Sequence, residues 1–159
     1  MTQVHERTRS TSRPLPDEVA LDRPRAPSSR AGALLRSLGA VAVLVVGAVH
    51  LEQYFAVHFD VVPVIGPLFV LNFAAATVIG LGLLVPSARL QSVRVLLAVA
   101  GIGLAATSFV FLFVSEHRPL FGFQDYGFRT AIVIALAAEA AAVVLLGGYL
   151  AVRARRRPA

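Results

Sequence analysis

The residues that could carry chemistry in this chain lie inside long apolar stretches. Glu139 occurs near the middle of the apolar run 131–152. A carboxylate at such a depth costs about 2.5 to 3.5 kcal/mol on insertion scales, so it needs a partner or a function. Proton exchange or ligand binding at Glu139 is one hypothesis, and a structural hydrogen bond to another buried side chain is the alternative.

Other polar residues occur at a similar depth in the remaining apolar runs. His50 and Asn72 each fall roughly 10 Å from the same side of the predicted membrane, at 1.5 Å per residue. An interhelical hydrogen bond is the structural alternative for both. We predict one polar pocket in the outer half of a helix bundle, and its members are His50, Gln53, Tyr54, Asn72, Thr107, Ser108 and Glu139.

Spacing limits which neighbours of His50 can join this pocket. Gln53 and Tyr54 follow His50 by three and four residues and therefore share its helix face. Glu52 follows it by two residues, about 200° around the helix, so Glu52 and His50 cannot both face the bundle centre. We expect Glu52 to face a neighbouring helix, another subunit or the membrane interface.

Metal, thiol and cofactor chemistry are not expected. The chain has neither cysteine nor lysine, which excludes thiolate ligands and Schiff bases. His50 and His58 are about 12 Å apart along a helix axis and cannot share an ion. No serine nucleophile elbow or glycine-rich phosphate loop is present. We therefore predict no metal, no cofactor and no recognisable catalytic residue.

Composition identifies the class of protein. Hydrophobic residues make up 57% of the 159 positions and charged residues only 15%, and the mean hydropathy is +0.73. These values are too apolar for an ordinary soluble domain and indicate a membrane protein. The apolar runs lack the alternation of barrel strands, so helices are expected to satisfy their backbone hydrogen bonds.

The apolar runs predict an all-α bundle of four transmembrane helices between residues 37 and 152. The short linkers between them predict up-down-up-down order. Residues 1–36 are rich in Arg, Pro and Ser and are expected to form a disordered tail, and residues 153–159 a basic C-terminal tail. The helices are expected at about 38–57, 64–85, 93–114 and 130–152.

Arginine placement predicts the orientation of the bundle. Both tails and the middle linker, with Arg89 and Arg94, are basic, whereas the other two linkers carry few arginines. Positively charged linkers remain cytoplasmic, so we expect both termini on the cytoplasmic side of the plasma membrane. This asymmetry explains the formal charge of +6 without nucleic-acid binding. Anionic lipid is an expected partner of Arg153, Arg155, Arg156 and Arg157.

Residues 47–73 read GAVHLEQYFAVHFDVVPVIGPLFVLNF, in which a histidine and aromatic residues precede a short loop with Pro, Ile, Gly, Leu and Phe. This stretch resembles the first hairpin of uncharacterised small four-helix membrane proteins of actinobacteria. The resemblance implies a four-helix topology and no known activity. Glu52 departs from the pattern, which has a histidine or a neutral residue there, so no ligand set is carried over.

Three functions follow as hypotheses. The first is a non-enzymatic accessory or complex subunit, whose outer polar cluster holds helices together or binds a small partner. The second is a proton-coupled transporter that acts as a dimer through Glu139, although the inner half of the bundle offers no polar route. The third is an enzyme acting on a lipid or quinone of the outer leaflet, for which the sequence shows no nucleophile and base pair.

Overall fold

The computed structural model describes residues 28–56, 58–87, 91–119, 121, 127 and 129–155, and these residues form helices and no strand. All four α-helices are long and apolar enough to cross a membrane, which confirms the predicted all-α class and the four helices. In chain order the elements are α1 (Ser28–Ala56), the 3-10 turn η1 (Phe59–Val61), α2 (Ile65–Leu84), α3 (Gln91–Ser115) and α4 (Thr130–Ala154).

Helix α1 begins earlier than the apolar run that predicted it. Residues 28–36, which were expected to belong to a disordered tail, are helical. The reason is tertiary packing, because Leu35 of α1 packs over Gly148 of α4 and residues there gain contacts that the sequence pattern does not reveal. The rest of that predicted tail, residues 1–27, lies outside the described residues, as do Arg156 and Arg157.

The connection between α1 and α2 is a tight fold that buries one aromatic side chain. His58 and Val64 have positive φ angles, of 59° and 71°, and His58 is in the left-handed helical region. Gly66 then lies against the turn, where a β-carbon would come 2.5 Å from the carbonyl oxygen of Phe59. Phe59 is buried and packs on Phe69 of α2, with ring centroids 4.8 Å apart.

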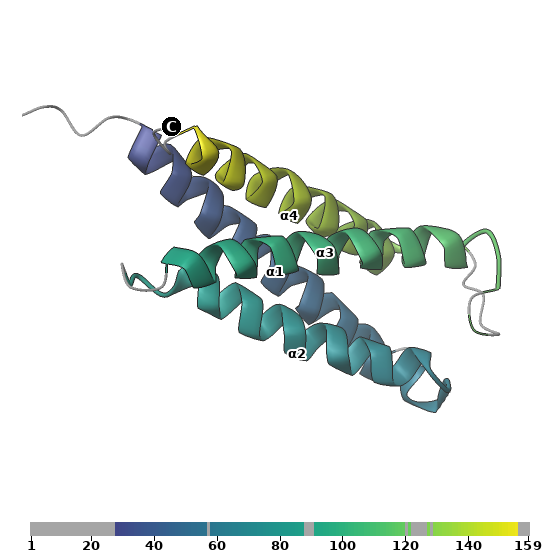
Figure 1. Ribbon diagram of the computed structural model, residues 1–159. Coiled ribbons are helices and arrows are strands. Elements are labelled where there is room, and N and C mark those ends of the chain that lie inside the picture. Colours follow the sequence, from purple (N-terminus) through teal and green to yellow (C-terminus); the bar gives the residue numbers. More distant parts are fainter. Residues whose placement is uncertain are drawn as a thin grey trace, which may run out of the picture.

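Helix α1 is the central element of the bundle. It packs extensively along both α2 and α4, and α3 packs along α4 and less extensively along α2 (Figure 1). Among the described residues, the backbones of α2 and α4 make no close contact. The bundle therefore has two well-packed seams beside α1 and a looser one between α2 and α3.

The two ends of the bundle differ in how closely the helices approach. We call the end with residues 30–46, 79–87, 91–101 and 142–155 the Arg36 end, and the opposite end, with residues 47–56, 58–72, 104–119 and 129–139, the His50 end. At the Arg36 end, leucine side chains pack against glycines of neighbouring helices. Gly39 and Gly101 both lie against the fully buried Leu146, and Gly80 lies against Leu44. Close approach of helix backbones through small residues is typical of membrane bundles.

Candidate functional site

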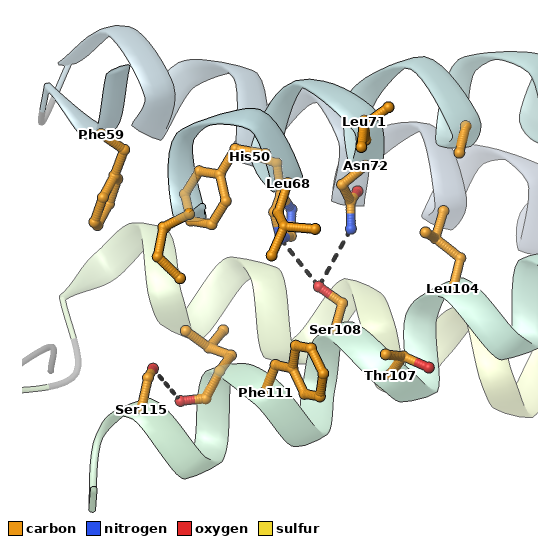
Figure 2. A pocket seen from close by; sticks show the side chains of 14 residues that line it. His50, Phe59, Leu68, Leu71, Asn72, Leu104, Thr107, Ser108, Phe111 and Ser115 are labelled. Atoms are coloured by element: carbon orange, nitrogen blue, oxygen red, sulfur yellow. Dashed lines mark hydrogen bonds between the residues drawn. The ribbon is translucent and has the colours of Figure 1, made fainter. Parts of the chain in front are cut away.

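A cavity lies between α2 and α3 at the His50 end. It has a volume of about 320 Å³ and is lined by residues 65–75 of α2 and 104–115 of α3, with His50 of α1 and Phe59 of η1 closing it (Figure 2). We call it the α2–α3 groove. Its walls are mostly apolar, and exposed side chains such as Leu68, Leu71 and Phe111 form its rim.

The groove follows from how α2 and α3 pack. Near the Arg36 end, Leu97 of α3 packs against Gly82, and Ile79 against Gly101. From there the two helices diverge towards the His50 end (Figure 1). Larger side chains, among them Phe69, occupy the widening space without closing it.

A chain of hydrogen bonds crosses the polar part of the groove. Ser108 Oγ lies 3.0 Å from His50 Nε2, and Asn72 Nδ2 lies 3.4 Å from Ser108 Oγ (Figure 2). His50 Nδ1 lies 2.8 Å from the carbonyl oxygen of Val46. The structure thus brings together three of the predicted pocket residues, one each from α1, α2 and α3.

The direction of each bond follows from the chemistry of the groups. The Val46 carbonyl can only accept, so His50 Nδ1 carries the proton and donates it. In the neutral ring Nε2 then has a free lone pair and accepts from the Ser108 hydroxyl. The Ser108 oxygen in turn accepts from the amide of Asn72. This order fixes His50 in one tautomer.

Aromatic packing holds the imidazole in place. Phe69 contacts His50 edge to face, with ring centroids 4.9 Å apart. Because Phe69 also packs on Phe59, the histidine is buried behind two aromatic rings, with 8% of its surface exposed. The second ring nitrogen, Nε2, therefore faces Ser108 and not solvent.

Asn72 has an unused acceptor in the groove wall. Its Oδ1 is buried and has no hydrogen-bond partner among the described residues. A buried acceptor left without a donor costs about 1 to 3 kcal/mol. A ligand with a hydroxyl or an N–H group could supply the missing donor once the Asn72 amide turns its oxygen into the groove.

Glu139 lies behind this chain of bonds, on α4. Its side chain is 0% exposed, and neither carboxyl oxygen has a hydrogen-bond partner among the described residues. Ser108 is near enough to interact with the carboxyl group, without forming a direct bond of normal geometry. Ser108 therefore has one hydroxyl proton and two acceptors beside it, His50 Nε2 and Glu139.

Three other predicted pocket residues lie outside the hydrogen-bonded chain. Gln53 is buried beside a small cavity of about 30 Å³ that Arg129 also lines, and its amide donates to the side chain of Glu52. Tyr54 is half-buried and packs on Phe55. Thr107 is exposed and lines the α2–α3 groove without a polar partner in it.

Glu52 and Gln53 differ in burial as their spacing from His50 requires. Glu52 is exposed, whereas Gln53 is buried on the side of His50. Gln53 Oε1 has no hydrogen-bond partner among the described residues, so it is a further unsatisfied acceptor at this end.

The contact between Ser108 and His50 is the arrangement that activates serine nucleophiles. Among the described residues, the rest of such a site is not assembled. Ser108 lies inside α3, where backbone N–H groups bond within the helix and cannot form an oxyanion hole. Its oxygen also accepts from Asn72. The geometry suits binding better than acyl transfer.

The geometry offers no metal centre within the part of the chain that the structure describes. No three His, Cys, Asp or Glu side chains there lie close enough together to hold an ion. His117, in the turn after α3, bonds the carbonyl of Phe113 at the end of that helix, and His58 is exposed in the turn before η1.

Sequence reasoning did not identify the aromatic and hydroxyl residues that shape the groove. Phe59, Phe69 and Ser115 line it, and none of them was a predicted pocket residue. Phe69 is three residues from Asn72, so a shared helix face was the signal available in the sequence. No comparable signal existed for Phe59, whose position depends on the turn that follows α1.

Comparisons with family models, curated proteins and solved structures give no match to this chain. The assignment of a function therefore depends on the fold and the groove described above.

Proposed function

We propose that this chain is a multi-pass protein of the plasma membrane in up-down-up-down order, with both termini in the cytoplasm. Support for the order comes from contacts along α1 and α4, where Leu35 meets Gly148 while Gly39 meets Leu146, so residue numbers rise on one helix as they fall on the other. Support for the orientation comes from Arg30, Arg36, Arg94, Arg153 and Arg155, which belong to the Arg36 end.

Orientation can be tested directly because the chain contains no cysteine. Arg118→Cys in the linker after α3 and Arg155→Cys after α4 are made singly. A membrane-impermeant maleimide added to intact cells is expected to label the first variant, and the second only after the membrane is permeabilised. The reverse pattern refutes the orientation, and labelling of both in intact cells refutes the order of the helices.

We propose further that the protein is a non-enzymatic membrane component whose α2–α3 groove binds an amphipathic molecule from the bilayer. The ligand would have a long apolar part and a hydroxyl or similar hydrogen-bond donor at its head. One observation carries this proposal: Asn72 Oδ1 is a buried acceptor without a partner, in the wall of an otherwise apolar groove.

The shape of the groove supports a ligand that enters from the lipid. Its rim residues Leu68, Leu71 and Phe111 are exposed, and in a membrane they would face acyl chains. Apolar pockets with a few placed polar groups are typical small-molecule sites, in which the polar groups fix the orientation. Anionic lipid at the C-terminal arginines would be a separate, electrostatic interaction.

The test uses a long-chain alcohol that carries a photoactivatable diazirine, and the matching methyl ester, which lacks the hydroxyl donor. Purified protein in lipid nanodiscs is irradiated with each probe, and the labelled residues are mapped by mass spectrometry. We expect the alcohol to label residues 65–75 and 104–115 more strongly than the ester does. Asn72→Leu should reduce labelling by the alcohol roughly two- to tenfold, the value of one hydrogen bond.

Two alanines of α2 provide a matched control for this experiment. Ala75 lines the groove, and its neighbour Ala74 is exposed and does not. Ala75→Phe should fill the groove and abolish labelling there, whereas Ala74→Phe should leave it unchanged. Equal labelling by alcohol and ester in the wild-type protein would mean that bulk lipid simply fills the groove, and would refute a specific ligand.

A second candidate function is the proton-coupled transporter acting through Glu139. The observation in its favour is that this buried carboxyl group has no hydrogen-bond partner among the described residues. Glu139 is fully buried within one chain, and this burial does not favour a site that two subunits of a dimer share. Glu139→Gln should abolish proton-linked uptake of a cationic dye into vesicles if the transporter function is correct, and leave groove labelling intact.

A further inference from the structure

Two arginine side chains meet at the C-terminal end of α2, far from the groove. The Arg36 guanidinium donates from Nη1 to the carbonyl oxygen of Leu83, and Arg94 donates from Nη2 to that of Val85, 2.6 Å away. The last carbonyls of a helix lack partners within the helix and carry the negative end of its dipole. This capping explains why arginines from α1 and α3 converge on one point.

Capping leaves most of their hydrogen-bonding capacity unused. Each guanidinium has five N–H donors, and Arg94 Nε is buried without a partner among the described residues. Arg36 is also close enough to Arg94 for the two positive charges to interact. Like charges at such a distance repel, so an anion between or beside them would be strongly favoured.

The described residues supply no such anion. Their four carboxylates are Glu52, Asp60, Glu116 and Glu139, and none of them belongs to the Arg36 end. Carboxylates therefore cannot neutralise the two guanidinium groups within the part of the chain that the structure describes. An anion that is not among the described residues, such as a lipid phosphate, could balance the charge.

Helix α4 contributes two further residues, Tyr149 and Arg153, to the surroundings of Arg36 and Arg94. Tyr149 is buried and lies close enough to Arg36 to interact with it. Arg153 follows Tyr149 by four residues and so shares its helix face, and its Nε is also buried without a partner among the described residues. Three helices thus bring arginine donors to the same end of the bundle.

We propose that Arg36 and Arg94, with Arg153 beside them, form a phosphate-binding site that takes the phosphodiester of an anionic phospholipid. The planar guanidinium matches the oxygens of a phosphate with paired hydrogen bonds, and arginine is the usual residue for this recognition. The site lies at the end of apolar helices, where lipid headgroups meet them. It differs from the attraction predicted for the C-terminal arginines, because α1 and α3 supply two of its residues.

The test measures lipid binding to the purified full-length chain by native mass spectrometry. The protein is titrated with phosphatidylglycerol and separately with phosphatidylcholine, whose phosphate is paired with its own choline cation. We expect tighter binding of phosphatidylglycerol. Arg94→Gln should weaken that binding about fivefold, the effect of one basic residue at a membrane surface. Arg118→Gln removes the same charge at the opposite end and should have no effect.

Arg94→Lys separates the role of charge from that of the planar donor group. It keeps the charge and a donor for Val85, so the fold is preserved, but it loses the paired geometry. We expect an affinity between those of the wild type and Arg94→Gln. Equal binding of the two lipids, or equal weakening by Arg94→Gln and Arg118→Gln, would overturn the site.

A last experiment distinguishes a phospholipid headgroup from free phosphate as the ligand. Inorganic phosphate is added to the wild-type protein without lipid and with phosphatidylglycerol bound. Failure to displace the lipid supports a phospholipid ligand. Displacement that depends on Arg94 supports the same phosphate chemistry with a soluble source. The groove is at the other end of the bundle, so neither result bears on the proposed groove ligand, which the photolabelling experiment tests separately.

Discussion

The two ends of this bundle differ in helix packing and in the polar groups that they bury, although the same four helices form both. At the Arg36 end, leucines pack into glycines, and arginines of α1 and α3 cap the last carbonyls of α2. At the His50 end, α2 and α3 diverge, a groove opens, and three helices contribute polar side chains to the interior. One end is built for close packing, and the other keeps space and hydrogen-bonding groups.

This difference leaves buried hydrogen-bond acceptors without donors at the His50 end. Asn72, Gln53 and Glu139 all have buried oxygen atoms without partners among the described residues. Each such atom costs about 1 to 3 kcal/mol, and apolar residues of the same size would avoid that cost. Close packing at the Arg36 end would then supply the stability that allows the His50 end to keep these groups.

The largest expected effect comes from a cavity at the closely packed end. Leu146 is fully buried between Gly39 and Gly101, so Leu146→Ala leaves a void that the helix backbones cannot close easily. We expect a loss of about 2 to 5 kcal/mol in the free energy of unfolding, measured by denaturation in mixed micelles. Val144→Ala, at a position 71% exposed on the same helix, is the control and should change it little.

A smaller effect, of opposite sign, is expected at Glu139. Glu139→Met keeps the length of the side chain and removes two unpartnered oxygens from the interior. The variant should be more stable by about 1 to 3 kcal/mol in the same denaturation assay. Glu139→Gln retains a polar group and should gain less. Destabilisation by Glu139→Met would show that the carboxyl group has a structural partner, and would remove the contrast between the two ends.

The smallest effect concerns the bond between Asn72 and Ser108. At 3.4 Å it is long, and interhelical hydrogen bonds in membranes contribute about 0.6 kcal/mol on average. A double-mutant cycle with Asn72→Leu and Ser108→Ala should therefore give a coupling energy near that value. Coupling well above 1.5 kcal/mol would mean that the polar chain holds α2 to α3, which favours a structural role over a ligand site.

Much of the fold could be predicted because the signals are local. Apolar runs of about 20 residues define helices that can cross a membrane, whatever their neighbours. The start of α1 could not be predicted in this way, because residues 28–36 are helical through contacts with α4. The sequence likewise gave no warning of the positive φ angles of His58 and Val64.

For the candidate site, the level of each residue along its helix could be estimated from the sequence, but the direction in which its side chain points could not. Counting residues placed His50, Asn72 and Ser108 at one level, and the structure joins them by hydrogen bonds. Spacing along the helix face of His50 added Tyr54 to them, and the same count of depth added Thr107, although neither takes part in that chain of bonds. Residue spacing gives height along an axis, whereas the rotation of each helix depends on every helix packed against it.

By itself the amino-acid sequence indicated four helices long and apolar enough to cross a membrane, with most of the arginines in the two terminal segments and the middle linker. Those properties depend on composition and on order along the chain. Only the tertiary structure decided that α2 and α3 diverge into a groove, that Ser108 lies between His50 and Glu139, and that Arg36 meets Arg94. These contacts join residues distant in sequence, and helix packing alone brings them together.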